Sequence, residues 1–193
     1  CGQKDTGSDL QTVTKGKLTM STNAQFPPYE SVADDGKGYE GTGFEGIDIE
    51  IAYALAQKLG LELVVDDMDF DSALSAVQTG KSDIVAAGVT VTPERQNTMS
   101  FTDSYANGVQ VVIVKEGSDI KSIDDLQGKK IGTQRGTTGF IYCSDDYGDD
   151  NVIGFDDGAT AVQNLLAGKV DCVVIDNVPA QEYVKANAGL TIL

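Results

Sequence analysis

The sequence contains no histidine and no tryptophan among its 193 residues. Imidazole is the commonest metal ligand and the usual proton carrier in catalysis, so imidazole metal sites and histidine-based triads are excluded. Long apolar runs are also missing, because none approaches the roughly 18 residues that a membrane-spanning helix needs. Cations are scarce: 14 Lys and Arg against 30 Asp and Glu give a net charge of −16. This charge repels phosphates, so nucleic acid is not an expected partner.

Cysteine is rare as well, with Cys1, Cys143 and Cys172 the three examples. Cys1 and the polar segment after it resemble a bacterial lipoprotein whose signal peptide has been removed. We therefore predict a lipid anchor on Cys1 and a tether over residues 1–16. The alternative is a chain that starts at a cysteine by chance. Cys143 and Cys172 lie where small apolar residues pack well, and a disulfide is the alternative to free, packed thiols.

The first half of the chain alternates strand and helix patterns. Apolar residues recur every four positions and predict an amphipathic helix: Ile47, Ile51, Leu55 and Leu59. Gly60 ends this helix, and Asp71 is predicted to cap a second one that ends at Gly80. Strands are predicted at 17–22, 61–65 and 83–88. The order β-α-β-α-β indicates a parallel sheet covered by helices.

The second half repeats this organisation, with a boundary predicted near residues 105–108. The expected strands and helices are, in chain order, 109–115, 122–128, 129–134, 137–146, 151–155, 158–168 and 170–176. Two segments share one plan, namely a helix end, Gly-Lys-x-Asp and an apolar strand: "VQTGKSDIVAAG" at 77–88 and "LLAGKVDCVVID" at 165–176. This internal repeat predicts two lobes of similar α/β structure.

One cation lies where a helix does not favour it. Thr92 is a good N-cap, which puts Arg95 in the first helical turn, where the helix dipole opposes a positive charge. This position indicates an anion that comes from outside, and a guanidinium fork suits a carboxylate. The alternative is a surface arginine paired with Glu94 or Asp103.

Two more stretches could bind charged groups of a ligand, one an anion and the other a cation. Thr137 and Thr138 follow Gly136 at a predicted helix start, where backbone N–H groups bind anions. No phosphate-loop pattern is present, so a small carboxylate fits better than a nucleotide. Asp176 ends an apolar strand and can accept a cation; its alternative role is to cap the next helix, in competition with Asn177.

Phe26 and Phe70 are candidate aromatic walls of the same site, although core packing is the usual role of phenylalanine. An anion clamp, a cation acceptor and apolar walls together suit a small zwitterion, which is an α-amino acid. In open α/β sheets ligands bind outside the carboxyl ends of strands, where these residues are expected.

Five stretches occur in order between residues 17 and 186: NAQFPPYE, GIDIEIAYALAQKLG, FDSALSAVQTGKSDIVAAGVTVTPERQNTMSFTDSY, LQGKKIGTQRGTTG and LLAGKVDCVVID. Together they resemble the bacterial extracellular solute-binding proteins of family 3, the amino-acid receptors of ABC importers. The resemblance implies an α/β fold of the periplasmic-binding-protein type II, in which two lobes joined by a hinge close on the ligand. The lobes would span 17–106 and 107–193.

By position, the resemblance also implies how the ligand's charged ends are held. Arg95 would bind the α-carboxylate, assisted by the backbone N–H groups of Thr90 and Thr138. Asp176, the carbonyl of Gly88 and the Thr90 hydroxyl would hold the α-ammonium.

For the ligand's side chain, the resemblance implies a sandwich between Phe26 and Phe70, with Asn23 and Gln134 at its polar end. Several family members carry Asp at the position of Asn23, and that acid favours cationic ligands. The neutral amide weakens the case for lysine or arginine.

Other acids of this chain leave a cationic ligand open, because Glu30 or Glu45 could replace the missing Asp. A glutamate ligand finds no spare cation beyond Arg135. We therefore expect a neutral polar amino acid. Family members also return to the first lobe after the segment that ends near Leu193, adding a strand and a long helix. Nothing in this sequence supplies that return, so the first lobe should lack part of its cover.

The expected function is the substrate-binding component of an ABC transporter, which captures an L-amino acid and delivers it to a membrane permease. We expect a monomer without cofactor or metal, anchored through Cys1 and facing outside the cytoplasm. One alternative is the ligand-sensing domain of a receptor. Another is an exported dehydratase acting on cyclic amino acids, which would need a general acid or base such as Glu30 or Glu45.

Overall fold

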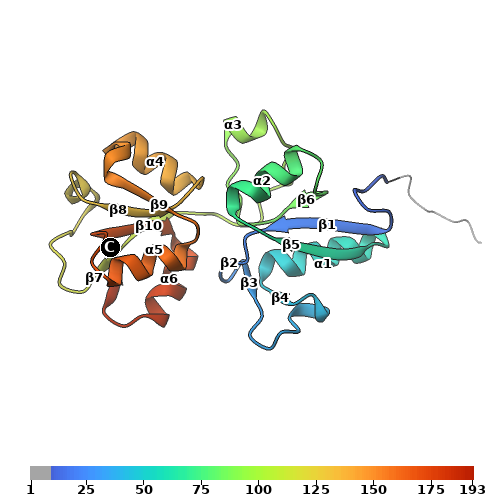
Figure 1. Ribbon diagram of the computed structural model, residues 1–193, viewed down its shortest axis with the longest axis horizontal. Helices are drawn as coiled ribbons and strands as arrows, with labels where there is room; N and C mark the ends of the chain where they lie inside the picture. The colour runs from blue at the N-terminus through green and yellow to red at the C-terminus, as the bar shows by residue number, and fades with distance from the viewer. Residues whose placement is uncertain (1–9) are drawn as a thin grey trace, which may run out of the picture.

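The computed structural model describes residues 10–193. The lipidation predicted at Cys1 falls outside these residues. Two groups of elements lie next to each other along the long axis of the molecule (Figure 1). The first lobe contains β1–β6 and α1–α3, and the second contains β7–β11 and α4–α6. Two α/β lobes agree with the predicted fold class, while the division at residues 106 and 107 stays a prediction. No helix within residues 10–193 is long and apolar enough to cross a membrane.

The first lobe is built on a three-stranded parallel sheet. β1 (Lys17–Thr22) lies between β5 (Glu62–Asp67) and β6 (Ile84–Val85), and both neighbours run parallel to it. Helix α1 (Ile47–Leu59) contacts one face of the sheet through Met20, and α2 (Phe70–Gln78) packs on the other face. The short elements are β2 (Gln25–Phe26), β3 (Glu30–Val32), the 3-10 turn at Tyr39–Gly41, β4 (Phe44–Glu45) and α3 (Pro93–Gln96).

Helix α1 presents the opposite face to the core from the one expected. Its bounds and its left-handed Gly60 C-cap match the prediction. The four-residue series is nevertheless exposed: Ile47 and Ile51 at 44 %, Leu55 and Leu59 at 37 %. The buried face consists of Asp48, Ile49, Ala52 and Ala56. Small side chains let the helix approach the sheet closely, so the bulky stripe points outward.

Two smaller expectations about the first lobe were also wrong. The residue at the N-cap position of α2 is Asp69, while Asp71 lies in the first turn. The strand expected at 83–88 is paired only over Ile84–Val85. The backbone beyond Ala86 leaves the sheet because Gly88 adopts a positive φ of 56°.

The second lobe is built on a five-stranded sheet in the order β11-β7-β10-β8-β9. Its strands are β7 (Gln110–Lys115), β8 (Ile131–Gln134), β9 (Val152–Phe155), β10 (Cys172–Asp176) and β11 (Leu190–Ile192). Its helices are α4 (Thr138–Tyr147), α5 (Gly158–Leu166) and α6 (Asn177–Ala186), with 3-10 turns at Ile123–Leu126 and Asp149–Asn151. β10 runs parallel to β8 and antiparallel to β7, so the sheet is mixed. Successive side chains of β10 enter the two cores on opposite faces.

The shared Gly-Lys-x-Asp segments have the same structure in both lobes. Gly80 and Gly168 end their helices with φ of 70° and 73°, and the following lysine N–H bonds back to the helix. The aspartate then ties its strand to a neighbour. Asp83 accepts the N–H of Thr19 over 2.8 Å, and Asp171 accepts the N–H of Lys130 over 2.8 Å. The repeated segment therefore ends a helix at a left-handed glycine, and its aspartate then hydrogen-bonds to the neighbouring strand.

Cys143 and Cys172 are free thiols buried in one core cluster of the second lobe. Burial raises the pKa of Cys143 to about 11 and that of Cys172 to about 12. Such thiols stay protonated near neutral pH and serve as small apolar residues, which is the first of the two roles considered for them.

Candidate functional site

A pocket lies between the lobes, at the carboxyl ends of β8 and β10 and beside the loops that follow β1 and β6. The structure brings all nine predicted ligand-binding residues into its lining: Asn23, Phe26, Phe70, Gly88, Thr90, Arg95, Gln134, Thr138 and Asp176. Thr137, considered with Thr138 as part of an anion site, and Glu30, considered as a substitute counter-charge, line it as well. Three further lining residues were not considered: Ala87, Gln110 and Ile175. The roles of the predicted residues toward a ligand stay predictions.

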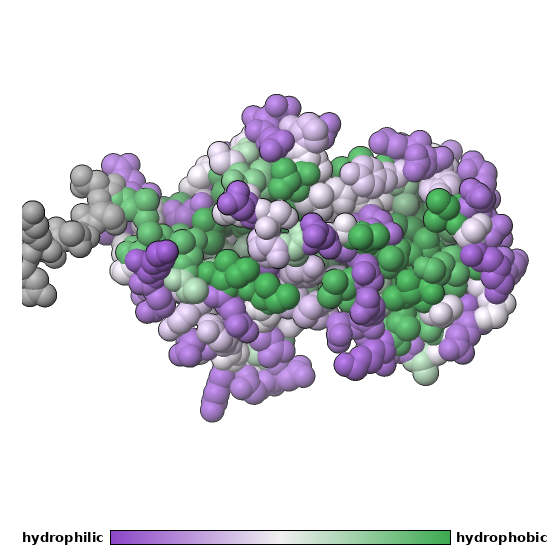
Figure 2. Space-filling view, turned by 180° about the vertical axis from the view of Figure 1, so that it is seen from behind, coloured by the Kyte–Doolittle hydropathy of each residue, from purple (hydrophilic) through white to green (hydrophobic). Residues whose placement is uncertain are grey.

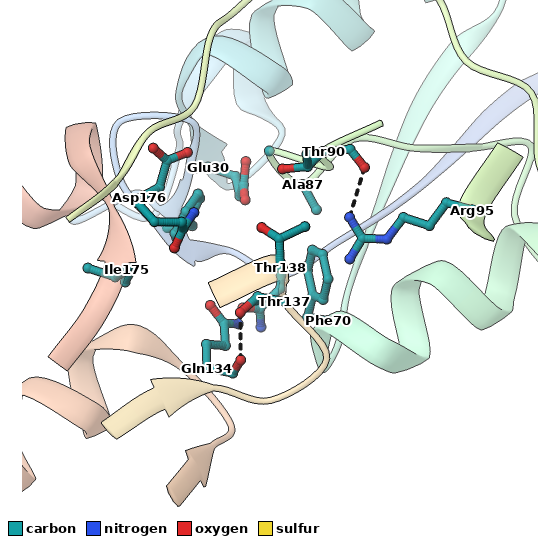
Figure 3. A pocket seen from close by; sticks show the side chains of 14 residues that line it. Glu30, Phe70, Ala87, Thr90, Arg95, Gln134, Thr137, Thr138, Ile175 and Asp176 are labelled. Atoms are coloured by element: carbon teal, nitrogen blue, oxygen red, sulfur yellow. Dashed lines mark hydrogen bonds between the residues drawn. The ribbon is translucent and has the colours of Figure 1, made fainter. Parts of the chain in front are cut away.

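Arg95 enters the pocket from a short helix that begins as expected. The hydroxyl of Thr92 accepts the N–H of Arg95 over 3.2 Å and caps α3. The guanidinium lies over the Phe70 ring, 5.4 Å from its centroid. It donates from Nη1 to the Thr90 carbonyl over 2.8 Å (Figure 3) and from Nη2 to the Gly136 carbonyl over 3.1 Å. Both acceptors are neutral backbone groups.

No carboxylate forms an ion pair with Arg95 among residues 10–193, so the pairing considered with Glu94 or Asp103 is not present. The chain's other arginine differs. Arg135 pairs with Asp156 over 2.8 Å and also donates to a backbone carbonyl. Burial lowers the pKa of Arg95, but its ordinary value is so high that the group stays charged. The Asp71 carboxylate acts on the Arg95 charge from beyond ion-pair distance. A half-buried cation that no acid contacts directly is suited to an anionic ligand.

Asp176 provides the opposite charge at the end of β10. It stands at the N-cap position of α6, yet its side chain makes no capping hydrogen bond. Its Oδ1 instead accepts the N–H of Val109, in the connection between the lobes, over 3.0 Å. Burial raises the pKa of Asp176, so the carboxylate gains from a cationic partner. In Figure 3 Asp176 and Arg95 enter the pocket from opposite sides.

The start of α4 forms a third part of the lining. Gly136 has a φ of 74°, which turns the chain after β8. The Thr137 hydroxyl caps the helix by accepting the Phe140 N–H over 3.3 Å, and it donates to the Gln134 carbonyl over 2.7 Å. The first N–H groups of a helix have no acceptor within it, so the backbone N–H of Thr138 is available to an anion in the pocket.

Aromatic rings close two sides of the pocket. Phe70 lies beneath the Arg95 guanidinium, and Phe26 stacks on Tyr29 with 5.8 Å between ring centroids. Gly88 packs directly against Phe26, since a Cβ on this glycine would come within 2.9 Å of the ring. The aromatic walls therefore depend on a glycine at this position.

One acid in the pocket was not predicted as a site residue. Glu30 is 1 % exposed, and its carboxylate oxygens accept no hydrogen bond from an N–H or hydroxyl donor. Its side chain instead lies within hydrogen-bonding reach of the Asp48 carboxyl. Burial, then the nearby carboxyls of Asp48 and Asp67, raise its pKa well above the ordinary value. Asp48 is better supported, because it accepts the Gly88 N–H over 2.9 Å and the Tyr105 hydroxyl over 2.8 Å. In the sequence, Glu30 is the acid that directly follows FPPY. It was considered only as a replacement for the Asp that family members carry at position 23.

Comparison with known proteins decides the family. The family model described as bacterial extracellular solute-binding proteins, family 3, matches residues 18–171. The chain belongs to this family. It is 34 % identical over 197 residues to the arginine-binding extracellular protein ArtP of Bacillus subtilis, which covers 98 % of this chain and 71 % of that protein.

Solved structures with the same fold confirm the type II periplasmic-binding-protein architecture. An ancestral arginine-binding protein bound to glutamine superposes with a TM-score of 0.85 at 40 % identity, covering 93 % of this chain and 79 % of that one. The same kind of ancestral protein bound to arginine gives a TM-score of 0.83 at 42 % identity, with the same coverage. The relatives are named as binding proteins, and none of these names denotes an enzyme.

Proposed function

We propose that this solute-binding protein captures an L-amino acid between its lobes and delivers it unchanged to the membrane permease of an ABC importer. The observation that carries this proposal is the Arg95 guanidinium, which forms no ion pair within residues 10–193, in the same pocket as the carboxylate of Asp176. The two charges suit the carboxylate and ammonium of a zwitterion. The names of the arginine-binding relatives support the same class of ligand.

The ligand's side chain is proposed to be cationic, with arginine as the first candidate. On the sequence alone, the neutral amide of Asn23 favoured a neutral polar ligand. Glu30, buried in the pocket without a cationic partner among residues 10–193, supplies the acid that position 23 lacks. Arg95 is the one cation among the described residues that line the pocket, against Glu30 and Asp176. A ligand with two positive groups and one negative group balances this set of charges.

A thermal-shift screen against the twenty amino acids tests the function directly, because a ligand that binds only the folded state raises its apparent stability. Arginine should produce the largest rise in Tm, and Arg95→Ala should abolish it. A screen in which no amino acid raises Tm would reject the function. A rise with neutral amino acids alone would reject the cationic ligand and leave the function standing.

The site of action is proposed to be the outer face of the cell membrane, with a monomer anchored through Cys1. The family description, extracellular, supports the location. Mass analysis of the N-terminal peptide from native membranes should show acyl chains on Cys1. An unmodified cysteine there would reject the anchor. Static light scattering of the purified protein should give the mass of one chain.

A further inference from the structure

Glu30 is a buried carboxyl that the ligand's charged backbone does not use. It is 1 % exposed, lines the same pocket as Arg95 and Asp176, and accepts no hydrogen bond from an N–H or hydroxyl donor. Its one side-chain hydrogen-bond partner is the Asp48 carboxyl. In the view of Figure 3 it lies between the sides from which Arg95 and Asp176 enter. The titratable groups around it come from five parts of the chain and are acidic: Tyr29, Asp48, Asp67, Tyr105 and Tyr183.

Asp48 is the group that holds the negative charge of this cluster. It is as deeply buried as Glu30, at 1 % exposure, but it accepts two hydrogen bonds, from the Gly88 N–H and the Tyr105 hydroxyl. Donors of this kind stabilise the ionised form of a carboxyl. Glu30 has no such donor, and two neighbouring buried carboxyls cannot both ionise without a large electrostatic cost. One proton therefore belongs to the pair, and it resides on Glu30.

We infer that Glu30 is protonated in the empty pocket and releases its proton to solvent when a cationic side chain binds, whereas it keeps the proton when a neutral amide side chain binds. This rests on the proposed function. As a carboxylate, Glu30 pairs with a guanidinium; as a carboxylic acid, it donates a hydrogen bond to an amide oxygen. The protonation state of one residue thus selects between two classes of amino acid.

The charges balance in both cases. A cationic ligand adds its side-chain charge and the Glu30 proton leaves for the buffer, so the cluster gains no net charge. A neutral ligand adds none, and no proton moves. Burial and two nearby carboxyls raise the pKa of Glu30, which agrees with a protonated resting state. Asp176 differs, because it meets the ammonium that all amino acids share, so its contribution is the same for both ligand classes.

The inference predicts a pH dependence that differs between ligands. Release of one proton makes the affinity for arginine rise about tenfold per pH unit, as long as the pH lies below the raised pKa of Glu30 and above its value in the complex. The affinity for glutamine should lack this slope. Groups that contribute equally to the binding of both ligands, such as Asp176, cancel in the ratio of the arginine affinity to the glutamine affinity. The pH dependence of this ratio therefore reports on Glu30.

Isothermal titration calorimetry of the whole chain can count the protons. Arginine and glutamine are titrated near neutral pH in phosphate and in Tris, two buffers with very different ionisation enthalpies. We expect about one proton more to be released with arginine than with glutamine. Glu30→Gln, which copies the shape of the protonated form, should abolish this difference and weaken arginine relative to glutamine. The control is Glu50→Gln, an exposed acid of α1, which should behave as wild type.

Each outcome bears on a separate claim. Arginine binding with the same proton count as glutamine in the wild type would overturn the inference and leave the proposed function intact. An unchanged difference in Glu30→Gln would also overturn it, because the proton would then come from another group. If no amino acid binds, the proposed function fails with it.

Discussion

The Gln134 side chain of the second lobe donates from Nε2 to Oδ1 of Asn23 in the first lobe over 2.8 Å, and both side chains are buried. Asn23 in turn donates to the Met68 carbonyl over 3.0 Å. A second bond crosses the lobes where the Tyr183 hydroxyl donates to the Gln25 carbonyl over 2.7 Å. The two lobes are therefore in contact across the pocket, and polar groups of both hold them there.

Tyr183→Phe removes one of these bonds at a place that does not line the pocket. The closed form should lose about 0.5–1.5 kcal/mol, the usual net contribution of a hydrogen bond. The affinity for every amino acid that binds should then fall by the same factor, while their order stays the same. Calorimetry with arginine and glutamine measures this. A change in the ratio of the two affinities would mean that Tyr183 also acts on the ligand side chain, either directly or through the nearby Glu30.

Gly136→Ala should hinder closure. A Cβ at Gly136 would collide with the Asp71 carboxylate of the first lobe. The positive φ of 74° adds a backbone cost of about 1–2 kcal/mol to the folded state. If closure loses about 1.4 kcal/mol or more, ligand affinity falls at least tenfold.

Asp71→Ala makes room for the added methyl group and supplies the matched control for that variant. The double variant Gly136→Ala with Asp71→Ala should recover most of the affinity but not the lost stability. Affinity by calorimetry and Tm by circular dichroism separate the two effects. If the double variant binds as weakly as Gly136→Ala alone, the contact with Asp71 does not limit closure.

Arg95→Ala should lose amino-acid binding and keep the fold. Two charge-assisted hydrogen bonds of about 1.5–3 kcal/mol each would disappear with the guanidinium. Arg95→Lys should bind with intermediate affinity, because an ammonium cannot form the bidentate fork. Arg135→Ala is the control, since that arginine is occupied by Asp156. Equal affinity in wild type and Arg95→Ala, measured by calorimetry, would remove Arg95 from the site.

Asp176→Asn should weaken binding of all amino acids by about 2–5 kcal/mol, because the ammonium loses its buried counter-charge. Asp145→Asn, an exposed residue on α4, is the matched control. Since burial raises the pKa of Asp176, wild-type affinity should also decline as the pH falls through that raised value, and this decline should be missing in Asp176→Asn. Titrations at several pH values with glutamine measure both effects.

Glu30→Gln should stabilise the empty protein at neutral pH. The folded state keeps the Glu30 proton above pH 4.5, where the unfolded chain has begun to release it. The unfolded state then binds fewer protons, so the free energy of unfolding falls as the pH rises toward the raised pKa. The variant carries no titrating group there, so its advantage in Tm should grow from acidic to neutral pH. Thermal unfolding curves for wild type and variant that stay parallel across this range would contradict the raised pKa.

The order of elements could be predicted from the sequence because periodicity and capping residues are local. The helix over 47–59 and the strand over 17–22 were placed to the residue. The orientation of α1 could not be predicted, since two stripes of this helix are apolar and only the packed sheet selects the alanine stripe. The helix α6 was implied only through its possible cap at Asp176, and β11 was not predicted.

The site shows the same division. Arg95, Thr138 and Asp176 were predicted to lie together because each ends a strand or starts a helix at one edge of the sheets. Glu30 was not assigned, since its chemistry arises from burial beside Asp48, which is 18 positions away in the sequence. Spacing reveals which residues reach an edge, whereas long-range contacts decide which carboxyl loses its solvent.

The Arg95 guanidinium uses two of its five N–H donors for backbone carbonyls, that of Thr90 in its own lobe and that of Gly136 in the other. Three N–H donors remain that a ligand carboxylate can use. Because Nη2 bonds to the Gly136 carbonyl, the side chain that is proposed to hold the ligand carboxylate also links the two lobes. One arginine therefore ties the capture of an anion to the relative position of the lobes.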